Sequence, residues 1–368
     1  MIRIKFTGDI MCQIAQNEAC HTNGAYCYAP VFAKAMDTLA DCDFLVGNLE
    51  TPLAGPEQRY SYERYSFNTP DAFAYALKEA GFHALSTANN HCMDRGIEGI
   101  VRTLRVVREA GMDPIGTQMP GERRAYVKSI GGIRVGFISY TYGTNAFFHH
   151  QYLPTGWEDA VNLLQPEECM PGAIDLLDEG AIEARVRELY GAPNRLFAER
   201  IAPMHERMRT DIADCRAAGA EYVIALLHCG GQYNAMPDAY TRHIVRVLRG
   251  FGVDAIVGHH PHVVHPLEQG NGCPVAYSLG NFTDTPQNPP RGSELRSVYS
   301  AVLCLEIEER KGIQRVSHEW MKSVLRLDGI CEVVPVDRLL LEATAAERAA
   351  LEEDVRFCET VLATPVPE

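Results

Sequence analysis

One short segment of the chain is rich in histidine. Four of the 13 histidines fall within positions 259–265, in the run Gly-His-His-Pro-His-Val-Val-His that begins at Gly258. Residues 253–257 (VDAIV) have the apolar character of a short buried strand, so the histidines follow a strand end. Side chains two apart in extended backbone point the same way, and we therefore expect His260 and His262 to address one point in space. Imidazole is the commonest metal ligand, so this segment predicts half of a metal site; the alternative is a polar loop with solvent-facing histidines.

The order of a strand followed by a polar residue recurs at four other places. Short apolar or alternating runs end on polar side chains, namely Asp9, Glu50, Asn90 with His91, and His228. Such runs, alternating with helical stretches, predict parallel strands buried under helices. Ligands bind at the carboxyl ends of the strands in sheets of this kind. Two carboxylates, an amide oxygen and three imidazoles exceed the needs of one divalent ion and suit two ions that share a bridging carboxylate.

Each of these residues also has a simpler interpretation. An acid after a strand, such as Asp9 or Glu50, is often a helix N-cap or a surface residue, and Asn90 is a common turn residue. A lone histidine after an apolar run, such as His228, is more often a core residue than a metal ligand. The metal hypothesis therefore depends on all of them occurring together, a coincidence much rarer than any single one.

Taken in order and spacing, these motifs resemble a known family. The matching segments span about residues 2–284 and are GDIM at 8–11, NLE at 48–50, ANNH at 88–91 with Asp94 and Gly96, GHHPHV at 258–263 and YSLGNF at 277–282. They resemble the CapA-type capsule-synthesis proteins of poly-γ-glutamate biosynthesis, which look like a branch of the calcineurin-like metallophosphoesterases. The resemblance implies an α/β fold, a calcineurin-like four-layer α/β/β/α sandwich of two mixed sheets flanked by helices. We expect this domain over residues 1–330, followed by a C-terminal helical extension at 331–368.

The resemblance also implies site residues. The positions that match the family's metal-ligand motifs, with Glu50 as the bridge, are Asp9, Glu50, Asn90, His228, His260 and His262. Mixed nitrogen and oxygen ligands suit one or two divalent transition metals, Mn, Fe or Zn, better than Ca or Mg. His91 matches the histidine that acts beside the metals, and Asp94 is expected to orient it. His91 would then protonate the leaving group or bind the developing oxyanion.

The function expected from this inventory is a dinuclear-metal-dependent hydrolase. A hydroxide bridging the two metals would attack a phosphoester or a related bond. The alternatives are a protein of poly-γ-glutamate (capsule) biosynthesis or processing, and a non-catalytic scaffold that retains a metal site. Three departures from the family bear on the substrate: Met11 replaces a histidine of the broader phosphoesterases, Asn68 stands where relatives often have arginine, and the segment after His228 lacks the usual aromatic and acidic residues.

Several segments are candidates for substrate contacts. Arg59 and Arg64 alternate with tyrosines shortly after Glu50, and guanidinium groups bind carboxylate or phosphate; a solvated hairpin or loop is the alternative. Asn89 and the spare histidine His259 are further candidates. Residues 144–196, rich in Pro and Gly, interrupt the strand–helix rhythm, and a segment this long suggests a cap over the metal site.

Composition limits the partners. Acidic residues outnumber basic ones 48 to 34, for a net charge of −14, so we expect a small-molecule or anionic polymer substrate and no nucleic acid. The N-terminus reads as a strand rather than a signal peptide, and no apolar run reaches the roughly 18–20 residues of a membrane span. The 12 cysteines are scattered and read as free thiols, which indicates a cytoplasmic protein. Helical periodicity predicts covering helices at 69–80, 97–110, 207–218, 238–249 and 344–362.

Overall fold

The computed structural model describes residues 1–62, 66–146, 150–167, 195–270, 272–284 and 293–367. Its larger sheet has eight strands in the order β16-β15-β14-β1-β4-β5-β6, with β13 also paired to β1. Their bounds are β1 (Ile2–Ile10), β4 (Phe44–Leu49), β5 (Ala84–Ser86), β6 (Asp113–Ile115), β13 (Asn281–Thr283), β14 (Tyr299–Glu308), β15 (Gly312–Leu325) and β16 (Cys331–Pro335). Pairing from β13 through β1 to β6 is parallel, whereas β14, β15 and β16 are antiparallel.

The smaller sheet has six strands in the order β11-β12-β10-β9-β8-β7. They are β7 (Tyr126–Ile130), β8 (Ile133–Thr141), β9 (Tyr222–His228), β10 (Ala255–His259), β11 (Leu267–Glu268) and β12 (Val275–Ala276). The four inner strands are parallel and the two edge strands antiparallel. Both sheets are therefore mixed, as expected.

The two sheets pack face to face over a shared apolar core. Side chains from the larger sheet meet those from the smaller one in a single cluster that includes Ile4, Phe6, Val46, Phe137, Ile224 and Val257. Strands covered on both faces are almost continuously apolar, because neither face meets water. This explains why strand prediction from apolar runs succeeds for β1, β4, β9 and β10.

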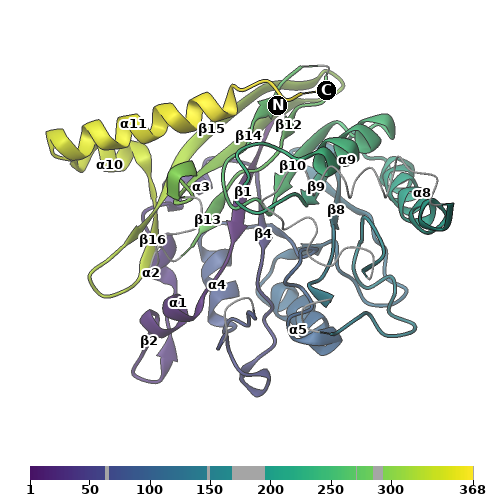
Figure 1. Ribbon diagram of the computed structural model, residues 1–368, viewed down its shortest axis with the longest axis horizontal. Coiled ribbons are helices and arrows are strands. Elements are labelled where there is room, and N and C mark those ends of the chain that lie inside the picture. Colours follow the sequence, from purple (N-terminus) through teal and green to yellow (C-terminus); the bar gives the residue numbers. More distant parts are fainter. Residues whose placement is uncertain (63–65, 147–149, 168–194, 271, 285–292, 368) are drawn as a thin grey trace.

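Helices cover the outer face of each sheet (Figure 1). On the larger sheet lie α1 (Ile14–Ala19), α2 (Ala29–Phe32), α3 (Met36–Ala40), α4 (Ala72–Glu79) and α5 (Gly96–Glu109). On the smaller sheet lie α8 (Arg195–Ala217) and α9 (Ala239–Gly250). The four layers α/β/β/α expected from the calcineurin-like resemblance are thus present. Among the described residues, none of the helices combines the length and apolar character that crossing a bilayer requires.

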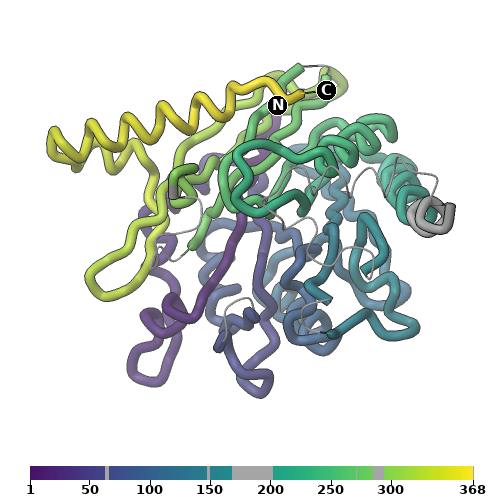
Figure 2. Tube along the Cα trace, viewed as in Figure 1, coloured from purple at the N-terminus to yellow at the C-terminus, as the bar shows by residue number. Residues whose placement is uncertain are grey.

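Colouring along the chain shows how the two halves are built (Figure 2). The purple to blue N-terminal segments form the centre of the larger sheet with α4 and α5, and the teal to green segments form the smaller sheet with α8 and α9. The chain then returns to the larger sheet, where β14 and β13 pair with the same edge of β1, β14 along Ile2–Phe6 and β13 at Asp9 and Ile10, while β4 pairs with the other edge. Residues far apart in sequence are thereby brought next to β1.

The C-terminal segment differs from the expected helical extension in its first residues. Residues 331–335 form β16, which pairs with β15, because Val333 and Val334 are buried in the sheet. Helices follow as α10 (Val336–Glu342) and α11 (Ala345–Leu362), the latter begun by a capping box in which Thr344 and Glu347 bond each other's backbone N–H groups. The boundary of the helical part therefore lies at Val336.

The expected cap at 144–196 is described only in part. Residues 168–194 lie outside the described part of the chain, as do 147–149. In the described part, Val161 and Leu163 pack against Met93 and Ile100, beside the segment that carries His91. The position is compatible with a cap, and that role stays a proposal.

Candidate metal centre

The predicted ligands lie where strands of both sheets end. Asp9 is the penultimate residue of β1 and Glu50 directly follows β4, while His228 is the last residue of β9. In the smaller sheet, His228 is paired with His259 at the end of β10. Parallel strands direct their carboxyl ends to the same edge, which is why these separate motifs converge.

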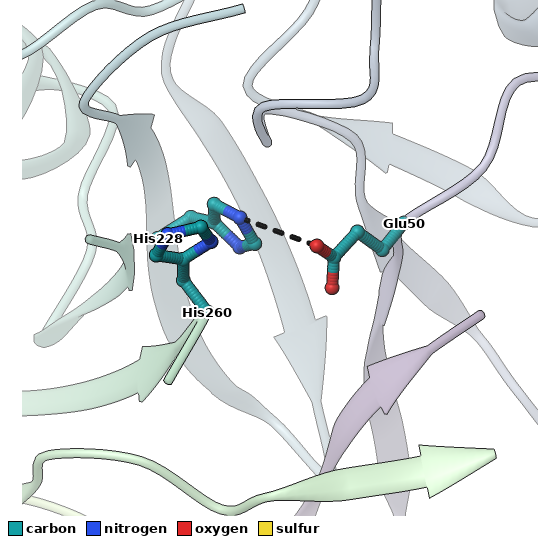
Figure 3. A group of neighbouring side chains, drawn as sticks. All are labelled: Glu50, His228 and His260. Carbon is teal, nitrogen blue, oxygen red and sulfur yellow. Dashed lines mark ion pairs between the residues drawn. The ribbon is translucent and has the colours of Figure 1, made fainter. Parts of the chain in front are cut away.

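Two clusters of side chains could each hold a metal ion, and they share one residue. Glu50, His228 and His260 form one cluster, and Asp9, Glu50 and His262 form the other; within each, the potential ligand atoms lie within 4.8 Å of one another. None of these residues is more than 4% exposed. Figure 3 shows the carboxylate of Glu50 directed toward His228 and His260. Glu50 thus occupies the position expected of a bridging ligand.

The cluster of Asp9, Glu50 and His262 is an ion-pair arrangement. The Nδ1 atom of His262 lies 3.3 Å from Oδ2 of Asp9, and its Nε2 lies 3.8 Å from Oε1 of Glu50. Burial alone would lower the pKa of His262, but the carboxylates of Glu50 and Asp9 outweigh it and raise that pKa to about 10. Burial opposes ionisation of Asp9 as well, yet its contact with His262 keeps the pKa of Asp9 below its ordinary value.

The cluster of Glu50, His228 and His260 is rich in imidazole. Nε2 of His228 lies 2.8 Å from Oδ1 of Asn90 and 3.7 Å from Oε1 of Glu50, and the rings of His228 and His260 are 4.7 Å apart between centroids. Burial, followed by the neighbouring imidazoles, lowers the pKa of His228 far below its ordinary value. His228 is therefore neutral, the form in which an imidazole binds a metal ion.

This donor set fits a divalent cation. Asp9 and Glu50 are both 0% exposed, and two carboxylate charges buried in one place are costly unless positive charge compensates them. Nitrogen and oxygen donors together suit Mn, Fe or Zn. Neither cluster contains a cysteine, and every cysteine in the described part of the chain is a free thiol.

The backbone of the histidine segment differs from the extended form we expected. His260 and His262 have φ angles of +96° and +59°, in the left-handed region that side chains other than glycine rarely adopt. Strand β10 ends at His259, and the backbone N–H of His260 donates to Oδ2 of Asp9 at 3.1 Å. The two imidazoles do converge, but through a strained turn rather than through strand alternation. Strain of this kind is typical of functional sites.

His91 and Asp94 form a buried pair beside the clusters. Nδ1 of His91 lies 2.7 Å from Oδ2 of Asp94, which also accepts the backbone N–H of Phe67 at 2.7 Å. The ring of Phe67 lies 4.3 Å from the ring of His91 between centroids. Asn90 contacts His228 instead, so the neighbours Asn90 and His91 point to different partners, as expected.

Two asparagines at the centre were not predicted as site residues. Nδ2 of Asn48 donates to Oδ1 of Asp9 at 2.8 Å and lies 3.2 Å from Nδ1 of His228, so it links the two sheets at the centre. Oδ1 of Asn281 lies 2.9 Å from Nδ1 of His262. Both residues belong to motifs quoted for the family resemblance, and that position was the only signal in the sequence.

Asn89 and His259, expected as substrate contacts, are engaged by the protein itself. Oδ1 of Asn89 accepts the backbone N–H of His91 at 3.1 Å and its Nδ2 donates to the carbonyl of Leu49 at 2.7 Å, so Asn89 closes a turn and ties it to β4. His259 is still within β10, and its Nε2 donates to the carbonyl of Thr7 at 3.1 Å. Both side chains therefore have partners within the fold, and their contact with a substrate stays a proposal.

Arg59 lines a cavity next to the His91–Asp94 pair. The cavity has a volume of about 700 Å³, and its lining includes Arg59, Tyr62, Asp94, Arg95 and Tyr152. The exposed guanidinium of Arg59 lies over the ring of Tyr62, 3.9 Å from its centroid. Buried Arg95 donates to the carbonyl oxygens of Gln58 and Arg59, which fixes this wall. Arg64 lies outside the described residues.

Two positions expected to depart from the family pattern, Asn68 and Met11, are buried. Asn68 accepts the backbone N–H of Ala54 and donates to the carbonyls of Gly55 and Arg59, so it holds the loop that carries Arg59. Met11 is 5% exposed and belongs to neither cluster. The asparagine at position 68 therefore shapes the cavity wall from within.

Comparisons with known proteins identify the family of the chain. The chain belongs to a family of bacterial capsule synthesis proteins: the family model described as bacterial capsule synthesis protein PGA_cap matches residues 3–286. The chain is 23% identical over 286 residues to the PGA biosynthesis protein CapA of Bacillus subtilis (strain 168), covering 77% of this chain and 63% of that protein. It is 27% identical over 261 residues to the capsule biosynthesis protein CapA of Bacillus anthracis, covering 68% of this chain and 53% of that protein. The chain thus spans less than two thirds of the length of either relative.

Solved structures give weaker matches. A Termus thermophilus sulfate thiohydrolase, SoxB, in complex with glycerol has a TM-score of 0.38 and 12% identity, over 92% of this chain and 48% of that chain. The 5'-nucleotidase from Candida albicans SC5314 has a TM-score of 0.43 and 10% identity, over 97% of this chain and 57% of that chain. At these TM-scores the likeness supports no argument about function.

Proposed function

We propose that this protein is a metal-dependent hydrolase that acts on a phosphoester or a related bond. The observation that carries the proposal is the sharing of Glu50 by two buried ligand clusters. Two divalent ions bound there would lower the pKa of a bound water toward neutrality and polarise the oxygens of the scissile group. The residues that would hold them are Asp9, Glu50, Asn90, His228, His260 and His262.

The chain's own residues supply the remaining roles. Asp94 accepts a hydrogen bond from Nδ1 of His91, and the ring of Phe67 packs against the same imidazole, so the ring is held in one orientation. Nε2 of His91 is then left for proton transfer to the leaving oxygen or nitrogen of the substrate. Positioned acid–base groups of this kind contribute about 10²–10⁴-fold to a rate.

The cavity beside His91 is the proposed substrate site. Arg59 offers an exposed guanidinium, and within the described residues no carboxylate forms an ion pair with it. A guanidinium in this position suits a substrate that carries a carboxylate or phosphate group. Tyr152, from the segment expected as a cap, lines the same cavity.

Family membership favours a second candidate function, in the making or processing of poly-γ-glutamate capsule. The relatives named for PGA and capsule biosynthesis support it. A polymer with one carboxylate per residue would present repeated anionic groups to Arg59, and its cleavage would be amide hydrolysis. The third alternative is a scaffold that holds metal without turnover.

A metal analysis combined with an activity screen separates these functions. The purified protein is loaded with Mn²⁺, Fe²⁺ or Zn²⁺ and assayed against phosphoesters and against γ-glutamyl polymer. Phosphoester cleavage supports the first function, polymer cleavage the second, and bound metal without turnover the scaffold. The double variant His260→Ala with His262→Ala should lose metal from at least one site, while His21→Ala with His318→Ala serves as control. Full metal occupancy in the first double variant would falsify the ligand assignment.

A further inference from the structure

Asn281 lies at the metal centre although it is remote in sequence from every other residue there except the histidine segment. It is the first residue of β13, which pairs in parallel with β1 so that Asn281 is opposite Asp9. Its side chain is 0% exposed. The backbone N–H of Asp9 donates to the carbonyl of Gly280 at 2.9 Å, which locks this register. A Cβ on Gly8 would lie 1.9 Å from the same carbonyl oxygen, so only glycine permits the approach.

The hydrogen-bond partners of Asn281 determine which way its amide faces. Its Nδ2 donates to Oδ2 of Asp284 at 3.0 Å, because a carboxylate can only accept. Oδ1 of Asp284 in turn accepts Nε2 of Gln13 at 2.7 Å, so the carboxylate is itself held in place. The carbonyl oxygen of Asn281 must therefore face His262, whose Nδ1 lies 2.9 Å away.

The same logic fixes the tautomer of His262. An amide oxygen cannot donate, so Nδ1 of His262 must carry the hydrogen of this bond. In the neutral imidazole the lone pair then resides on Nε2, the nitrogen that lies 3.8 Å from Oε1 of Glu50. We propose that Asn281 is a positioning residue that holds the Nδ1–H of His262 and so presents Nε2 as the metal-binding nitrogen. This inference rests on the proposed metal site.

Asn281 also protects a metal ligand. Oδ2 of Asp9 lies 3.3 Å from Nδ1 of His262 and is a competing acceptor for its hydrogen. An Nδ1–H bonded only to Asp9 would occupy an oxygen that the ion requires. Oδ2 of Asp9 already accepts the backbone N–H of His260, and because Asn281 offers a nearer acceptor, this oxygen is spared the hydrogen of His262 as well. Partners of ligand histidines commonly change metal affinity by 10–100-fold when they are removed.

Three variants test the role of Asn281. Asn281→Ala removes the oxygen that accepts the hydrogen bond from His262. The double variant Asn281→Asp with Asp284→Asn restores an accepting oxygen at position 281 and reverses the direction of the hydrogen bond between positions 281 and 284. In that double variant the carboxylate accepts from both His262 and the new amide, whose oxygen can still accept from Gln13. Asn162→Ala is the matched control, since Asn162 is also 0% exposed but bonds Gln118 instead of a ligand.

Two measurements give the outcome. Long-range ¹H–¹⁵N correlation spectra of the Zn²⁺-loaded protein should show His262 protonated at Nδ1 and coordinated through Nε2. Calorimetric titration with Zn²⁺ measures the affinity for each of the two ions. In Asn281→Ala the affinity for one ion should be about 10–100-fold lower than in the wild-type protein. The double variant should recover this affinity, and Asn162→Ala should leave it unchanged.

The inference and the proposed function fail in different ways. Coordination through Nδ1, or unchanged Zn²⁺ affinity in a folded Asn281→Ala variant, would overturn the role of Asn281 while the metal site stands. Absence of Zn²⁺ binding by the wild-type protein would overturn the proposed function itself. A loss of affinity that the double variant does not recover would mean that Asn281 acts through packing rather than through its hydrogen bond, which also overturns the inference.

Discussion

The two ligand clusters share Glu50 but differ in the state of their histidines. In one, His262 lies between two carboxylates and has a pKa of about 10. In the other, His228 is buried among imidazoles and beside the amide of Asn90, with a pKa far below its ordinary value. A metal ion must displace a proton from the first cluster, whereas the second already offers neutral donors. Two adjacent sites built on one carboxylate can therefore differ in how metal binding depends on pH.

Removal of the shared ligand should have the largest effect. Glu50→Ala takes an oxygen donor from both clusters, so we expect loss of both ions and no detectable hydrolysis. Metal content by mass spectrometry and turnover in the same sample provide the check. Glu352→Ala, an exposed site on α11, is the control. Retention of one tightly bound ion in Glu50→Ala would show that the two clusters do not depend on a common residue.

Loss of His91 should lower catalysis without affecting metal binding. His91→Ala should lower kcat by about 10²–10⁴-fold, because the proton donor is removed, with metal content unchanged. Asn90→Ala should instead lose metal first and activity as a consequence. Parallel kinetic and metal measurements on both variants test this. Should His91→Ala strip metal, His91 is a ligand; should it keep full turnover, its proposed role is wrong.

The pH dependence of metal binding should distinguish the clusters. Metal affinity at the Asp9 cluster should rise about tenfold per pH unit at neutral pH, because one proton leaves His262, while the cluster of His228 should show no such proton release. In the metal-free protein, the raised pKa of His262 stabilises the fold fully below its ordinary value of 6.5, and that stabilisation is lost as pH rises through about 10. Calorimetry in buffers of different ionisation enthalpy counts the protons. Equal proton release by the two ions would remove the distinction.

The smallest expected effect lies at the cavity. Arg59→Ala should raise KM about 10-fold with kcat nearly unchanged, as expected for one charge-assisted contact to the substrate. Arg59→Lys should raise KM by a smaller factor, since an ammonium keeps the charge but cannot make a bidentate contact. Arg105→Ala, exposed on α5, is the control. An unchanged KM in Arg59→Ala would place substrate recognition elsewhere.

Local patterns in the sequence were sufficient to place the strands and the residues at their ends. Apolar runs before Asp9, Glu50 and His228 predict β1, β4 and β9 because strands covered on both faces have little choice of residue type. Helix α11 was equally predictable, since Thr344 and Glu347 form its capping box. Residues of β16 were instead assigned to the helical extension, and β6, β7, β11, β12, β13 and β15 were not predicted as strands.

The partners of the ligands could not be read from local patterns. Asn48 and Asn281 act through contacts that depend on which strands lie side by side, and β13 pairs with β1 although most of the chain separates the two strands in sequence. The partners of Asn89 and His259 within the fold could not be predicted either, because the carbonyls of Leu49 and Thr7 belong to distant segments of the chain. The left-handed backbone at His260 and His262 was not predicted, because residues other than glycine adopt it only rarely and no local pattern marks where they do.

The most direct test of the account is electron paramagnetic resonance of the Mn²⁺-loaded protein, since Mn²⁺ ions that share a carboxylate are magnetically coupled. We expect two bound equivalents of Mn²⁺ with a coupled spectrum that disappears in Glu50→Ala. The uncoupled six-line spectrum of isolated Mn²⁺ at two equivalents, or no retained metal, would contradict a dinuclear centre built on Glu50.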